Sequence, residues 1–99
     1  MTWGVGDTYT PLVTLRANAL SLGLAPVTPV LEDYGVAALA RPIAANVSAG
    51  DGEPRTAALF QYTPAGYDGH FVALQNPAAE QDWLAFVGSY LQVGTPTVP

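Results

Sequence analysis

Two apolar runs on either side of one helical pattern restrict the fold of this 99-residue chain more than any other feature. Residues 2–5 form a short apolar run, and residues 57–62 form a second run that is apolar except for one glutamine. Such runs are typical of strands in a parallel sheet that is covered on both faces. Apolar residues recur at spacings of three and four over residues 11–22, which predicts an amphipathic helix. A strand, a helix and a second strand in this order predict a parallel crossover and therefore an α/β fold.

The connection between the helix and the second strand, residues 25–55, is the least regular part of the sequence. Four prolines interrupt it, and residues 46–52 are rich in turn formers. Its apolar residues allow a short strand over residues 29–31 and irregular or helical structure over residues 36–39. The segment is too apolar for a disordered linker. We expect it to be an elaborated connection near the pocket.

A second helix closes the chain. Asn76 followed by Pro77 is an N-cap with proline at the first helical position, which predicts a helix over residues 77–91. Its large apolar residues share one stripe, which we expect to be core: Trp83, Phe86, Val87, Tyr90 and Leu91. Residues 95–99 follow as a short tail. Residues 1–99 as a whole are expected to form a single, partial α/β domain.

The charge and the missing residue types exclude several classes of function. The net charge is −5, with three arginines and no lysine, whereas nucleic acids and anionic membrane surfaces require basic residues. The absence of cysteine excludes disulfides, thiolate metal ligands and cysteine nucleophiles. The acidic residues at 32–33 and at 51 and 53 lack the ligand density of a calcium loop. We therefore expect neither a metal nor another cofactor.

Hydrophobic segments that direct a protein to a membrane are not evident. No run approaches the roughly 20 apolar residues that a membrane-spanning helix needs. The first residues have no basic region and no long apolar stretch, so the sequence predicts no signal peptide. We expect a soluble chain without a membrane span, and the sequence does not indicate its compartment.

Asp7 and His70 are the candidate catalytic residues, because each follows one of the two predicted strands. Ligands of open α/β sheets bind at the carboxyl ends of the strands, where both residues are expected to lie. A carboxylate that holds the Nδ1 proton of a histidine leaves Nε2 free to accept a proton from a nucleophile. Glycines around His70 allow its loop to place the ring over the sheet.

The segments around these two residues resemble the α/β-hydrolase family. Residues 4–11 match a strand-end pattern, G-x-x-D-x-x-x-P, in which the aspartate is the triad acid. Residues 68–71, Asp-Gly-His-Phe, are similar to the D/H-G-H loop that carries the triad histidine in esterases and lipases. The two segments occur in the family's order, acid before histidine. The resemblance extends to the closing helix and corresponds to about the last third of a complete hydrolase.

The resemblance implies a nucleophilic serine, which this sequence does not provide. The family places that serine in a G-x-S-x-G turn between a strand and a helix, and no such motif occurs. Ser21 and Ser89 lie within predicted helices, and Ser48 matches only the last glycine of the motif. The resemblance therefore implies that the nucleophile and the oxyanion hole belong to a missing N-terminal segment of the hydrolase.

Two functions remain open on these grounds. The first is the C-terminal part of a carboxylic ester hydrolase, in which Asp7 orients His70 and His70 transfers protons to and from an ester or acyl substrate. Such a part would be inactive alone and would need the missing segment as a partner or self-associate, because an incomplete sheet exposes a strand edge. The alternative is a non-catalytic α/β binding or interaction module.

Overall fold

A pair of parallel strands lies at the centre of the computed structural model, which describes residues 1–99. Strand β1 (Thr2–Gly4) pairs with β5 (Phe60–Tyr62), with Trp3 opposite Gln61. The parallel pairing confirms the strand–helix–strand prediction. Strand β5 is shorter than the apolar run at residues 57–62. Leu59 does not pair with β1, because its N–H donates to Ala25 O in the segment on the other side of β5. Membership of this sheet in an α/β-hydrolase fold stays a prediction.

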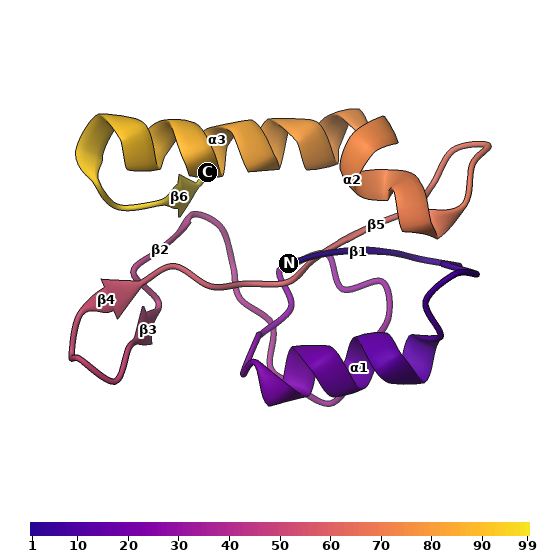
Figure 1. Ribbon diagram of the computed structural model, residues 1–99, viewed down its shortest axis with the longest axis horizontal. Coiled ribbons are helices and arrows are strands. Elements are labelled where there is room, and N and C mark those ends of the chain that lie inside the picture. Colours follow the sequence, from indigo (N-terminus) through magenta and orange to yellow (C-terminus); the bar gives the residue numbers. More distant parts are fainter.

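Helices cover the two sides of the strand pair (Figure 1). Helix α1 (Leu12–Ser21) agrees with the predicted range to within one residue at each end. Its fully buried Ala19 packs with Trp3, Leu24 and Leu59. Leu12, at the start of the predicted stripe, is exposed, so the buried side of α1 is narrower than the spacing of its leucines suggested. No helix of the structure has the length and apolar character to cross a membrane.

Helix α3 (Pro77–Val93) covers the other side and confirms the predicted capping signals. Asn76 Oδ1 accepts hydrogen bonds from the N–H groups of residues 78 and 79, at 3.0 and 3.3 Å. Gly94 ends the helix in the left-handed conformation, with φ of 77°. The core assignment of the stripe is wrong for Trp83, Tyr90 and Leu91, which are 59%, 56% and 77% exposed. The two-stranded sheet is too narrow to cover them.

Residues 25–55 form small paired strands and turns around this centre. Strand β2 (Ile43–Ala44) pairs antiparallel with β6 (Thr97–Val98), and β3 (Val47–Ser48) pairs with β4 (Pro54–Arg55). The strand considered over residues 29–31 does not form. Residues 95–99, expected as a tail, instead contain β6 and contribute the buried Val98.

The buried amide of Gln61 explains how the irregular segment is held without a strand at residues 29–31. Its Oε1 accepts hydrogen bonds from Leu31 N at 2.7 Å and Glu32 N at 3.0 Å, and its Nε2 donates to Glu32 O at 2.8 Å. One side chain of β5 therefore satisfies three backbone groups that a neighbouring strand would otherwise pair. This accounts for the single polar residue in an otherwise apolar run.

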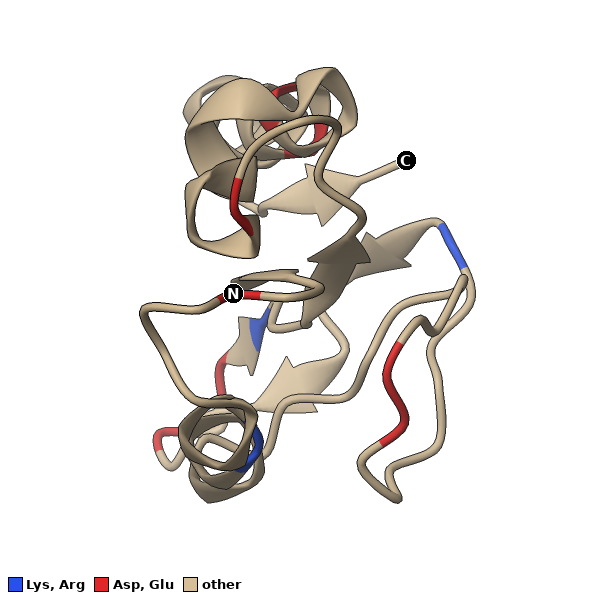
Figure 2. Ribbon diagram, turned by 90° about the vertical axis from the view of Figure 1, so that its right-hand side faces the viewer, with Lys and Arg blue, Asp and Glu red and all other residues tan.

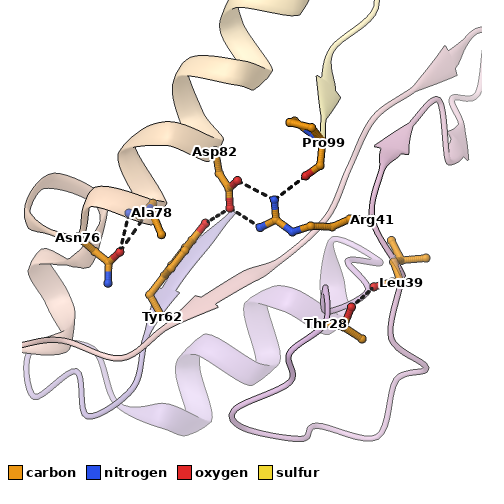
Figure 3. A network of polar contacts seen from close by, with 9 residues as sticks. Thr28, Leu39, Arg41, Tyr62, Asn76, Ala78, Asp82 and Pro99 are labelled. Atoms are coloured by element: carbon orange, nitrogen blue, oxygen red, sulfur yellow. Dashed lines mark hydrogen bonds and ion pairs between the residues drawn. The ribbon is translucent and has the colours of Figure 1, made fainter.

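A polar network around Asp82 fixes α3 on the sheet (Figure 3). Tyr62, at the end of β5, donates its hydroxyl to Asp82 Oδ2 at 2.6 Å. Arg41 binds both carboxylate oxygens and also donates to Pro99 O at 2.8 Å. Burial raises the pKa of Asp82, but the hydrogen bonds from Arg41 and Tyr62 outweigh it and hold the pKa below its usual value. The network joins β5, α3, the irregular segment and the C-terminal residues.

Removing the charge of Asp82 should lower the free energy of unfolding at neutral pH. It should also make that free energy depend less on pH in the acid range. A depressed pKa adds stability that is present above the unfolded-state value, near pH 4, and is lost as pH falls through the folded-state value. We expect Asp82→Asn to reduce the free energy of unfolding at pH 7 by about 1–3 kcal/mol. Urea unfolding between pH 2 and 7 measures both effects. Asp33→Asn is the control, since Asp33 only accepts a local bond from Gly35 N. Equal changes in both variants would contradict the role of the network.

Candidate functional site

The ends of β1 and β5 bring Asp7 and His70 together, although the two residues are far apart in the sequence. Asp7 follows β1 after two residues, and His70 lies in a short 3₁₀ turn, Gly69–Phe71, that follows the β5 loop. His70 Nδ1 lies 3.3 Å from Asp7 Oδ2. The expected approach of the two side chains is confirmed, and their catalytic role stays a prediction. We refer to this contact as the Asp7–His70 pair.

Asp7 is fixed by the turn that it begins. Its Oδ1 accepts hydrogen bonds from Tyr9 N at 2.9 Å and Thr10 N at 2.8 Å, which leaves Oδ2 for His70. The side chain is only 8% exposed. Burial raises the pKa of Asp7, but these two backbone bonds and the contact with His70 hold it below the usual value. The carboxylate is therefore charged near neutral pH and aimed at the imidazole.

His70 combines a fixed nitrogen with an accessible ring. Its side chain is 43% exposed, and Nε2 makes no hydrogen bond within the chain. The rings of Tyr9 and Phe71 flank the imidazole, with centroids at 4.9 and 5.2 Å. In the tautomer that donates Nδ1–H to Asp7, Nε2 can accept a proton from a hydroxyl group placed beside it. The arrangement is that of an oriented general base.

Two glycines allow the histidine loop to lie directly on the end of β1. A Cβ atom on Gly69 would lie 2.5 Å from Val5 O and 2.7 Å from Asp7 N. A Cβ on Gly4 would lie 1.9 Å from Gly69 O. The sequence indicated only that glycines around His70 make its loop flexible. The structure shows that Gly69 is required for close backbone packing.

The three serines lie on elements other than the two loops that carry the pair. Ser21 and Ser89 are within α1 and α3, as expected, and their hydroxyls donate to carbonyls of their own helices. Ser89 also accepts a hydrogen bond from Thr97 N, at 2.7 Å. Ser48 is in β3, on the hairpin formed by β3 and β4. These 99 residues therefore place an acid and a base together without a serine at Nε2.

Asp68 and Thr8, to which the sequence assigned no role of their own, join the two loops of the site. Asp68 Oδ2 accepts the Thr8 hydroxyl at 2.6 Å, and Asp68 Oδ1 accepts His70 N at 2.8 Å. An aspartate two residues before His70 is a recognisable cap for the turn that carries the histidine. The contact with Thr8 depends on tertiary structure and has no local signal.

Elsewhere the structure has a mostly apolar cavity and no cluster of metal-ligating side chains. No group of three or more His, Asp or Glu side chains lies close enough to hold a metal ion. A cavity of about 450 Å³ lies beneath α3, with Met1, Phe60, Trp83 and Phe86 among its mostly apolar lining. Neither Asp7 nor His70 lines this cavity. Figure 2 shows the acidic residues distributed over several elements and the few arginines apart from one another.

Comparisons with family models, curated proteins and solved structures give no match to this chain. In the Asp7–His70 pair the carboxylate can orient the imidazole, and the imidazole can transfer a proton. Together these form one part of nucleophilic catalysis.

Adding a methyl group at Gly69 should disrupt the site and weaken the fold. The added Cβ would overlap backbone atoms of residues 4–7, which cannot move as a flexible side chain can. We expect Gly69→Ala to lower the free energy of unfolding by about 1–3 kcal/mol. Gly88→Ala is the matched control, because Gly88 lies in α3 and a Cβ added there would have open space around it. This control should stabilise by about 0.5–1 kcal/mol. Urea unfolding of both variants tests the difference, and equal effects would contradict it.

Proposed function

We propose that this chain is the acid- and histidine-bearing part of a serine-type carboxylic ester hydrolase. The observation that carries the proposal is the 3.3 Å contact between His70 Nδ1 and Asp7 Oδ2 at the common end of two parallel strands. Asp7 orients the imidazole and stabilises its charged form, and His70 acts first as general base and then as general acid. The serine and the oxyanion donors come from another polypeptide segment.

The aromatic surroundings of His70 support an ester with an apolar group as substrate. Tyr9 and Phe71 flank the imidazole, and Tyr9 is largely exposed. Apolar rings next to an accessible general base favour an acyl or alkyl chain over a charged group. The scissile carbonyl would then lie between Nε2 of His70 and the serine of the completing segment.

The open edge of β1 supports completion by a further segment. β5 is the only strand paired with β1. Trp3 faces β5 in the ladder, so the backbone groups of Thr2 and Gly4 point to the opposite, unpaired edge. Trp83 and Leu91 on α3 are exposed apolar residues on the covering layer. A segment that adds a strand at this edge would also widen the sheet beneath α3.

The test is serine labelling in the polypeptide or complex that contains this chain together with the segment encoded immediately upstream. A fluorophosphonate probe should label one serine of that segment, and His70→Ala and Asp7→Asn should each reduce the labelling rate at least 100-fold. Asp33→Asn, in a remote turn, should have no effect. The isolated 99-residue chain should hydrolyse p-nitrophenyl acetate no faster than free imidazole, because it lacks the serine and oxyanion donors.

Two results would contradict this proposal. One is an upstream segment without a strand–G-x-S-x-G–helix pattern and without a labelled serine. The other is burst kinetics of the isolated chain that His70→Ala abolishes, since this would reveal a nucleophile within these 99 residues.

A non-catalytic interaction module is the second candidate. The observation that favours it is the exposure of large apolar residues on α3 above the 450 Å³ cavity. Such a module would use the apolar face of α3 itself for recognition, and the Asp7–His70 contact would only stabilise two loops.

The association state of the isolated chain distinguishes the two candidates. An incomplete sheet with an open strand edge should self-associate and unfold over a broad temperature range. Size-exclusion chromatography at several concentrations and thermal unfolding measure this. A concentration-independent monomer with a sharp, cooperative transition would contradict the hydrolase-part proposal and favour the free-standing module.

A further inference from the structure

The carboxylate of Asp68 contacts Thr8, the residue next to Asp7, and the backbone N–H of His70 itself. On one side it accepts the hydroxyl of Thr8 at 2.6 Å and lies 3.2 and 3.3 Å from Thr8 N. On the other side it accepts His70 N at 2.8 Å and thereby caps the 3₁₀ turn that carries the imidazole. One side chain therefore joins the loop after β1 to the loop after β5.

The pair needs such a connection because its own contact is long and partly open to solvent. The nitrogen–oxygen distance is 3.3 Å, and the His70 side chain is 43% exposed. The other bonds of Asp7 go to Tyr9 and Thr10 within its own loop, and they do not restrain the histidine loop. The hydrogen bonds that Asp68 accepts from Thr8 and from His70 N–H lower the pKa of its carboxyl group, so this acceptor is charged at neutral pH.

We infer that Asp68 and Thr8 form a clasp that positions His70 against Asp7. The inference rests on the proposed function, because it assigns positioning residues to that site. Neither Asp68 nor Thr8 takes part in proton transfer. The clasp keeps the imidazole in the orientation in which Nδ1 meets Asp7 and Nε2 faces outward to a hydroxyl.

If Asp68 and Thr8 position His70, removing either of them should weaken the electrostatic coupling between His70 and Asp7. It is measured as the rise in the pKa of Asp7 that His70→Gln causes, because this variant removes the imidazolium and its hydrogen bond. Carboxyl-carbon NMR titration of the 99-residue chain gives this rise with the native clasp and again in the presence of Asp68→Asn. Each rise compares two proteins with the same residue at position 68. The direct effect of the Asp68 charge on the pKa of Asp7 therefore cancels when the two rises are compared.

We expect the rise to fall to less than half when Asp68→Asn is present. Thr8→Val, which removes the hydroxyl and keeps the shape, should also reduce the rise. Thr8→Ser, which keeps the hydroxyl, should restore it. Asp33→Asn is the control, because Asp33 accepts a similar backbone bond two residues away and lies outside the site. Urea unfolding of each variant establishes that the titrated protein is folded.

The outcomes separate this inference from the proposed function. An unchanged rise with Asp68→Asn and with Thr8→Val would overturn the clasp and leave the pair intact. Equal reductions with Thr8→Val and Thr8→Ser would also overturn it, since the hydroxyl would then be irrelevant. If His70→Gln causes no rise in the native chain, the pair itself is uncoupled, and both the proposed function and the clasp fail.

Discussion

The parallel pairing of β1 with β5 is the constraint on which the rest of this structure depends. It aligns the carboxyl ends of two distant segments, and the residues that follow both strands therefore meet at one edge. It also forms the surface on which α1 and α3 pack from opposite sides. Two side chains of β5 connect this pair of strands to the rest of the chain. Gln61 bonds to the irregular segment, and Tyr62 bonds to Asp82 on α3.

Features encoded within a few residues could be predicted from the sequence. Asn76 and Pro77 mark the start of α3, and they could be recognised because capping depends on local backbone geometry. The strand–helix–strand order was sufficient to predict parallel strands, and hence that Asp7 and His70 lie at one edge. These inferences needed the order of elements and no detail of packing.

Features that depend on what surrounds an element could not be predicted. The stripe containing Trp83 and Leu91 has the spacing of a core-facing helix, but spacing does not reveal how wide a surface the rest of the chain offers. The irregular segment is held by the amide of Gln61, which in sequence is only an interruption of an apolar run. The bond between Thr8 and Asp68 likewise joins residues with no local relation.

The register of β1 and β5 has a consequence for how the site forms. The first contact of this ladder, from the Met1 amino group to Ala58 O, joins residues 57 positions apart. Closing a flexible loop of that length carries an entropic penalty of about 3–4 kcal/mol, which must be met before any residue at the strand ends can interact. No locally folded intermediate confined to either half of the chain can contain Asp7 beside His70. The site therefore exists only once the two halves of the chain have joined.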